Sequence, residues 1–324
     1  MNTLLIVGII IGAGFAFGEL VERLGLPRVT GYILAGVLLN PNVIPFVPVE
    51  FVQATQPITN VALAVLTFAV GGTLALAPLR ELGKGIAFIA LGEAELATLL
   101  VTIGALVTLP FLLHMEGATL IATYLPFALL LGSLASPTDP SATLAVIHQY
   151  RAKGPVAFSI MGVAALDDAL GIINFSLAGA AATVLIQHSP LSMASLISPL
   201  LSIGGAIALG VILGFFFHFV SGFLRGETEG LLIVLIIAIL TSCYGIAALF
   251  ELDRLLATMC VGITVVNFGR ERDKIFRLIE QYAEPLVFVI FFTISGMLLD
   301  FRILRDFLPL VLLFAAFQIG RAHV

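Results

Sequence analysis

Apolar runs long enough to cross a lipid bilayer follow one another from the first residues of this chain to the last. A membrane-spanning helix needs about 20 predominantly apolar residues. Of the 324 residues, 60% are hydrophobic and only 11% are charged, and the mean hydropathy is +1.15. A soluble domain of this size needs more charge than this to cover its surface. The sequence therefore predicts an all-α polytopic membrane protein.

Hydropathy divides the chain into about eleven spans separated by short polar segments. The first span lacks the basic leader and the small-residue cleavage site of a signal peptide, so we interpret it as a retained helix. We find no soluble domain and no low-complexity linker. The spans are predicted near residues 2–21, 29–47, 58–78, 85–112, 119–149, 155–187, 191–222, 229–250, 254–268, 282–299 and 303–318.

Lysine and arginine gather in alternate loops, which fixes the predicted orientation. By the positive-inside rule, the loops with the excess of basic residues face the cytoplasm. This places the N-terminus outside, and we expect a prokaryotic inner membrane. The loops after odd-numbered spans hold Arg23, Arg28, Arg80, Lys84, Arg151, Lys153, Arg225, Arg270, Arg272, Lys274 and Arg277, whereas those after even-numbered spans hold Arg254, Arg302 and Arg305.

The sequence argues against several partners and cofactors. No basic patch lies outside the short loops, which argues against nucleic-acid binding. The two cysteines, Cys243 and Cys260, lie inside apolar runs and have no metal-binding spacing. We therefore predict no cofactor, and membrane lipid is the expected surrounding.

The fifth predicted span contains two prolines three residues apart, Pro137 and Pro140. Proline lacks a backbone N–H and clashes with the carbonyl four residues earlier, so this span cannot be an intact helix. Irregular backbone inside a membrane survives only where it is buried in protein or lines a wet cavity. A broken helix near residues 136–140 would expose carbonyls, Ser136, Thr138 and Asp139 as an ion site. The alternatives are a simple proline kink, or a loop outside the membrane.

The sixth predicted span carries two consecutive carboxylates, Asp167 and Asp168, in an otherwise apolar segment. A charge in a bilayer costs roughly 2.5–3.5 kcal/mol on insertion scales, and packing gives no reason to include one. The two side chains point about 100° apart on a helix, so they cannot both face one ion squarely. Burial and mutual repulsion favour protonation of one of them, and they titrate as a coupled pair. The alternative is a buried acid locked in a structural pair.

Other polar residues inside the spans are weaker candidates. Glu93 and Glu95 in the fourth span could form part of a cation pathway, or pair with polar neighbours. His148 and His218 could sense pH, although an interfacial or hydrogen-bonded histidine is the simpler interpretation.

Four motifs occur along the chain in a characteristic order, and together they resemble those of the cation:proton antiporter superfamily, in its sodium/hydrogen exchanger transmembrane domain. The resemblance extends to about residue 317. The motifs are Leu26 to Gly36 (LPRVTGYILAG), Thr138-Asp139-Pro140, Asp167-Asp168, and Phe291-Phe292 followed by Ser295-Gly296-Met297 and Asp300.

The resemblance implies a fold, an assembly and a site. It implies a thirteen-helix fold with inverted repeats, acting as a homodimer through an elevator motion. It implies that Asp168 is the essential carboxylate, binding the transported Na⁺ or a proton, and that Asp167 is its variable partner. Thr138 and Asp139 would shape the site from the broken helix. In this family an Asp at the variable position usually accompanies electrogenic exchange, whereas Thr-Asp-Pro is commoner in the electroneutral branch, so the stoichiometry stays open.

The end of the chain departs from the family pattern. The family continues through two further helices after residue 318, so the resemblance implies that residues 1–318 are an incomplete transmembrane domain. Residues 319–324 (IGRAHV) match the translation of a common sequencing adaptor, and we expect them to be an artefact of that kind.

The sequence as a whole predicts a secondary antiporter that exchanges a monovalent cation, Na⁺ first, for H⁺ at the buried Asp pair. The chain is not expected to be an enzyme. A K⁺/H⁺ exchanger or a K⁺ efflux system of the same fold is the nearest alternative. A passive cation channel is the alternative of a different class, although a channel needs a ring or a multi-site filter. An aspartyl protease dyad of Asp139 and Asp168 would need two close carboxylates.

Overall fold

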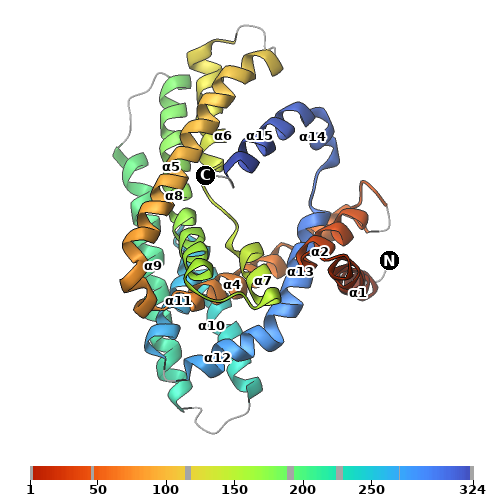
Figure 1. Ribbon diagram of the computed structural model, residues 1–324, viewed down its shortest axis with the longest axis vertical. Helices are drawn as coiled ribbons and strands as arrows, with labels where there is room; N and C mark the ends of the chain where they lie inside the picture. Colours follow the sequence, from red (N-terminus) through yellow and green to blue (C-terminus); the bar gives the residue numbers. More distant parts are fainter. Residues whose placement is uncertain are drawn as a thin grey trace. The chain divides into compact units, whose positions relative to one another are not determined.

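Helices make up the regular structure throughout the described part of this computed structural model (Figure 1). The structure describes residues 3–44, 47–113, 118–187, 193–223, 229–269 and 271–321. Arg225, Arg270 and the last three residues of the predicted adaptor-derived tail lie outside these ranges. The chain divides into two compact units, which are described here one at a time.

The first unit comprises residues 1–77, 140–161 and 205–301. Its core is formed by helices that approach closely at glycines, as small residues allow in membrane proteins. A methyl group at Gly36 of α2 would overlap the Thr293 carbonyl of α13, and one at Gly262 of α11 would overlap the Phe68 carbonyl of α4. The helices are α1 (Thr3–Arg23), α2 (Arg28–Leu38), α3 (Val49–Ala54), α4 (Gln56–Thr73), α7 (Pro140–Tyr150), α10 (Glu229–Leu249), α11 (Arg254–Phe268), α12 (Arg272–Leu278), the π-helix η2 (Ile279–Ala283) and α13 (Glu284–Met297).

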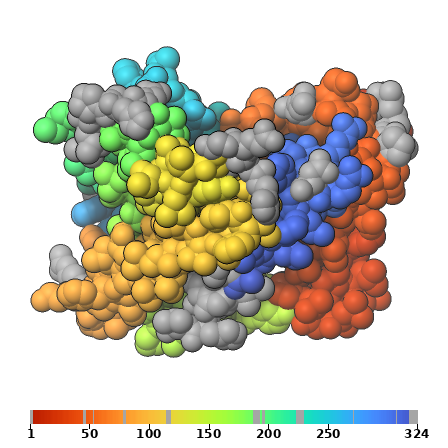
Figure 2. All heavy atoms as spheres, turned by 90° about the horizontal axis from the view of Figure 1, so that it is seen from above, coloured from red at the N-terminus to blue at the C-terminus, as the bar shows by residue number. Residues whose placement is uncertain are grey.

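The second unit comprises residues 78–139, 162–204 and 302–324. Figure 2 shows atoms of α5 (orange) and α6 (yellow) packed side by side. A buried cluster that includes Leu109 of α5 and Ala128 of α6 also touches Leu310 of α15. The helices are α5 (Leu76–Leu112), the π-helix η1 (Leu120–Tyr124), α6 (Leu125–Leu134), α8 (Pro155–Gln187), α9 (Met193–Phe223), α14 (Phe301–Asp306) and α15 (Leu308–Arg321). Of these, α5, α8 and α14 begin in the first unit, and α9 passes into it at Gly205.

The predicted all-α, multi-pass architecture is confirmed. Seven segments of the described chain are long and apolar enough to cross a membrane, and three shorter apolar helices coincide with further predicted spans. The shorter helices are Arg28–Leu38, Leu120–Leu134 and Arg254–Phe268.

Several span boundaries differ from the prediction. The tenth span, predicted over residues 282–299, begins at Arg272, so Arg272, Lys274 and Arg277 lie on a helix and not in a loop. The second span, predicted over residues 29–47, is helical only to Leu38, since Pro41 disfavours helical backbone in the residue before it. The fourth span begins earlier than residue 85, because α5 starts at Leu76 and runs for 37 residues. Arg80 and Lys84, predicted to lie in a loop, are therefore on the first turns of this helix. At about 1.5 Å per residue α5 is longer than the bilayer core is thick, so its charged beginning can extend beyond the apolar region.

Candidate functional site

The helix break predicted near residues 136–140 is confirmed. Helix α6 ends at Leu134, and the backbone stays non-helical until Pro140 opens α7. At the end of α6 the backbone hydrogen bonds span three residues instead of four. One of them is donated by the Ser136 N–H to the Ser133 carbonyl over 3.3 Å. Pro137 cannot donate at all, while Pro140 suits the first position of a helix, where its missing N–H is not needed. Local chemistry therefore explains both edges of the break.

The break and α8 meet through a hydrogen bond between two predicted site residues. The Thr138 hydroxyl donates to the Oδ2 atom of Asp167 over 3.0 Å. The Asp167 residue is fully buried, at 0% exposure, whereas Thr138 is exposed. The structure therefore places the hydroxyl of the non-helical segment directly on the buried carboxylate.

Helix α8 presents a flat face to the break because of Gly171, one turn after Asp167. A Cβ atom at Gly171 would lie 3.0 Å from the Cγ and Cδ atoms of Pro137. Residues four apart on a helix lie on the same face, so Asp167 and Gly171 form one contact surface. The sequence reasoning missed Gly171, and the i, i+4 spacing from Asp167 is the signal that could have found it.

The same stripe of α8 continues to Asn174, seven residues after Asp167. The Asn174 amide donates to the Thr98 hydroxyl of α5 over 3.3 Å. Helix α6 also packs on this part of α5, because a methyl group at Gly132 would overlap the Thr102 hydroxyl. Helices α5, α6 and α8 thus converge on the break, and Thr98 and Thr102 are polar residues that the sequence reasoning did not single out.

The two consecutive aspartates occupy different environments. Asp167 is buried, whereas Asp168 is half-buried, as expected for side chains that point about 100° apart on a helix. Asp139, the carboxylate within the break, is exposed. The break and α8 thus bring three carboxylates of graded burial into the same unit.

Ser136 adds a buried oxygen to the break. It is 0% exposed, and its hydroxyl has no hydrogen-bond partner among the residues that the structure describes. Leaving a buried polar group without a partner costs about 1–3 kcal/mol, which a bound ion or water can recover. Alkali and alkaline-earth cations prefer carboxylate, hydroxyl and carbonyl oxygens, and the break and α8 supply all three.

The predicted pathway residues Glu93 and Glu95 both lie on α5, in the same unit. Glu93 is half-buried and Glu95 is exposed. Glu95 stands one turn before Thr98, the residue that binds α8. Their part in an ion pathway stays a prediction.

A second buried acid lies in the first unit, and the sequence reasoning did not name it. Glu284 begins α13, and its Oε2 atom lies 2.6 Å from the Nδ1 atom of His148 on α7. The signal was a carboxylate inside the predicted apolar span 282–299.

Comparisons with known proteins agree with this fold. A sequence model of the family described as "Sodium/hydrogen exchanger, transmembrane" matches residues 5–324. The Na(+)/H(+) antiporter NhaP of Pseudomonas aeruginosa is 26% identical over 175 residues, which are 51% of this chain. The matched part spans only 40% of that relative's length.

Two structures of the sodium proton antiporter MjNhaP1 from Methanocaldococcus jannaschii have the same fold. The structure at pH 8 matches with a TM-score of 0.71 and the EM structure with a TM-score of 0.73. Both are 17% identical, and each match covers 98% of this chain and 75% of the other. The family comprises membrane transporters rather than enzymes. Because its sequence model spans nearly the whole chain, this multi-pass membrane protein belongs to the sodium/hydrogen exchanger family.

Proposed function

We propose that the protein is a secondary antiporter that exchanges a monovalent cation, Na⁺ first, for H⁺ at the aspartates of α8. One observation carries the proposal: the Thr138 hydroxyl of the helix break donates to the buried Asp167 carboxylate over 3.0 Å. The relatives NhaP and MjNhaP1 are named as sodium–proton antiporters, which supports the choice of ions.

The chemistry of exchange follows from competition at one site. A carboxylate at membrane depth is costly without a compensating positive charge, so it holds either a proton or a cation. The site then crosses between the two sides loaded with one or the other, and never empty. This obligatory loading couples the two ion flows, and alternating access of one site is sufficient for it.

The two aspartates have different roles in this proposal. Asp168, half-buried, takes the transported Na⁺ or proton, in keeping with the family resemblance. Asp167, held by Thr138, keeps the break against α8 and adds negative charge to the site. Asp139 and Ser136 supply further oxygen atoms from the break, and water completes the shell of the ion.

The assembly and orientation are part of the same proposal. Basic residues in alternate loops support an outside N-terminus, and a bacterial relative supports a prokaryotic inner membrane. A homodimer is proposed from the family resemblance.

Proton flux in inverted membrane vesicles tests the function. The full-length protein should dissipate a preformed proton gradient when Na⁺ is added, and Asp168→Asn should reduce this response to the background of empty membranes. Asp273→Asn is the matched control, because that side chain is 90% exposed and lies outside the site.

Each other result assigns a different function. A response to K⁺ and not to Na⁺ would make the protein a K⁺/H⁺ exchanger. A cation current without coupled proton movement would make it a channel. Full exchange by Asp168→Asn would contradict the assigned site.

A further inference from the structure

The last turn of α7 is fastened within the first unit by two neighbouring side chains. His148 contacts Glu284 of α13, with 2.6 Å between Nδ1 and Oε2. Gln149 donates to the Glu22 carboxylate of α1 over 3.2 Å and accepts from the Arg28 backbone N–H of α2 over 2.9 Å. Because α7 begins at Pro140, directly after Asp139, these contacts fix the far end of the half-helix that follows the break.

The His148–Glu284 contact depends on a proton. The Glu284 side chain is only 4% exposed, and His148 is its one ion-pair or hydrogen-bond partner among the described residues. A buried carboxylate without a compensating charge is strongly destabilising. While the pair holds a proton, its net charge is zero. After that proton leaves, Glu284 is a buried anion without a compensating charge, and the neutral imidazole of His148 can offer it only an uncharged hydrogen bond from Nδ1–H.

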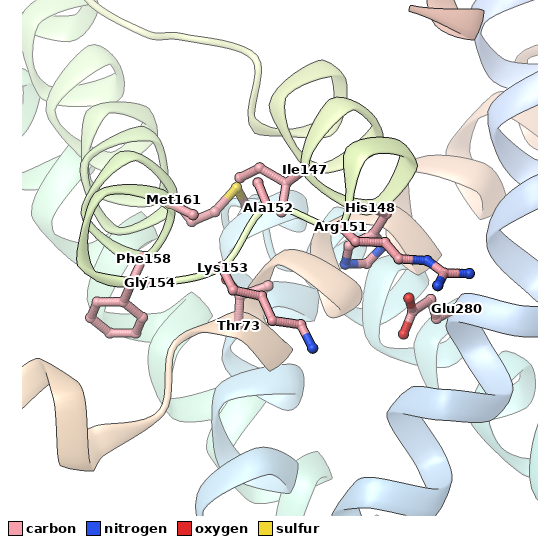
Figure 3. A pocket seen from close by; sticks show the side chains of 11 residues that line it. Thr73, Ile147, His148, Arg151, Ala152, Lys153, Gly154, Phe158, Met161 and Glu280 are labelled. Carbon is pink, nitrogen blue, oxygen red and sulfur yellow. The ribbon is translucent and has the colours of Figure 1, made fainter.

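The charges around the pair do not replace the missing proton. Beside it lies a pocket of about 620 Å³ that His148 lines together with Thr73 of α4 and Phe158 of α8. Figure 3 shows Arg151 and Lys153 extending from the turn between α7 and α8, with Glu280 facing Arg151. The charged residues of the pocket and of the ion pairs around His148 are Glu280 and Glu284 from η2 and α13, Arg151 and Lys153 from the turn, and Glu19, Glu22 and Arg28 from α1 and α2.

These charges nearly balance without the pair. Arg28 already pairs with Glu22 over 2.7 Å, and neither Arg151 nor Lys153 makes an ion pair within the part of the chain that the structure describes. Glu280 adds a like charge on the side of Glu284. The contact between α7 and α13 is therefore held by the proton on the pair.

We propose that His148 and Glu284 are a positioning pair whose shared proton latches α7 to α13, and whose deprotonation loosens this attachment of α7. The inference rests on the proposed function, since it matters for transport only if the break must move. The latch restrains the half-helix next to Asp139 at low pH and frees it as the pH rises through the range in which histidine titrates.

The latch has a kinetic signature that differs from proton competition at the transport site. Competition at Asp168 changes the apparent KM for Na⁺ and disappears at saturating Na⁺. The latch instead changes the fraction of molecules that can move, and so the maximal rate. The maximal rate should therefore rise with pH even when Na⁺ saturates the site.

The first test measures the maximal rate of cation/proton exchange by the variant Glu284→Gln. The amide of this variant keeps the shape of the side chain and can accept a hydrogen bond, but it carries no charge. Between about pH 5.5 and pH 8.5, on either side of the free histidine pKa of about 6.5, the wild-type maximal rate should rise at least about fivefold. The rise should fall below about twofold in Glu284→Gln and in His148→Gln, and the double variant should match the single ones because the residues act as a unit. Asp273→Asn is the matched control and should keep the wild-type profile, since that side chain is 90% exposed and does not line the pocket beside His148. A wild-type rise retained in Glu284→Gln would overturn the proposal.

Thermal unfolding of the purified protein is the second test, and it needs no transport activity. The pair stabilises the protein while it is protonated and loses this effect as the pH rises, so the wild-type Tm should exceed that of Glu284→Gln at low pH and fall to or below it at high pH. A Tm difference that is independent of pH would overturn the latch. A pH-dependent difference in a protein that moves no cation would keep the latch and reject the proposed antiport.

Discussion

At the scale of single residues, the site depends on a short hydroxyl side chain meeting a buried acid. Thr138 lies in the non-helical segment between the prolines, so its backbone is free to direct the side chain toward α8. Asp167 is fully buried and accepts the hydroxyl over 3.0 Å. Hydrogen bonds to charged groups contribute about 1.5–3 kcal/mol, more than neutral ones. The bond therefore fixes both the carboxylate and the break.

The variant Thr138→Val tests this bond while keeping the shape of the side chain. Loss of the donor leaves the Asp167 carboxylate less stabilised, and we expect the apparent KM for Na⁺ to rise about tenfold, which corresponds to about 1.4 kcal/mol. Sodium titrations of proton flux in vesicles measure the change. Thr138→Ser keeps the hydroxyl and should stay within about twofold of the wild type. An unchanged KM in Thr138→Val would show that the bond does not support ion binding.

At the scale of elements, α8 and the break fit together because a glycine faces a proline. Gly171 lies one turn from Asp167, where a Cβ atom would approach the Pro137 ring to 3.0 Å. The proline ring cannot move away by changing its rotamer. The backbone of the break must therefore shift if residue 171 carries a larger side chain. The distance between Thr138 and Asp167 thus depends on the absence of a side chain at residue 171.

The variant Gly171→Ala should therefore reduce the rate of cation/proton exchange several-fold without unfolding the protein, because the methyl group pushes the break away from Asp167 and Asp168. Gly179→Ala is the matched control on the same helix, since nothing lies within 4 Å of the Cβ position there. That control should keep full exchange and gain about 0.5–1 kcal/mol of stability from the better helix former. Proton-flux measurements test the expected exchange rates of both variants, and Tm measurements test their expected stabilities. Equal exchange rates would contradict the role of Gly171.

At the scale of the whole molecule, local sequence patterns predict some features of the fold and not others. The break at residues 136–140 could be predicted because proline acts on its own backbone and needs no partner. The effect of Pro41 on the residue before it explains the end of α2 at Leu38, but the prediction used hydropathy alone and extended that span to residue 47.

Contacts that depend on tertiary packing could not be predicted. Which of Asp167 and Asp168 is buried depends on how α8 is rotated against its neighbours, and the low amphipathicity of so apolar a helix does not specify that rotation. The His148–Glu284 pair joins residues 136 positions apart, and no local pattern connects them. Gly171 carries no chemistry by itself and becomes informative only once Pro137 is placed against it.

The orientation of the whole molecule in the membrane can be tested by labelling single cysteines, because the two native cysteines, Cys243 and Cys260, are buried. The basic turn between α7 and α8 is expected in the cytoplasm, so Lys153→Cys should react with a membrane-impermeant maleimide in inverted vesicles and not in intact cells. Glu50→Cys, on the exposed surface of α3 after the second span, should show the opposite pattern. The unsubstituted protein measures the background from the buried thiols. If Lys153→Cys were labelled in intact cells and Glu50→Cys only in inverted vesicles, the N-terminus would lie in the cytoplasm, and the proton-dependent latch would face the outside.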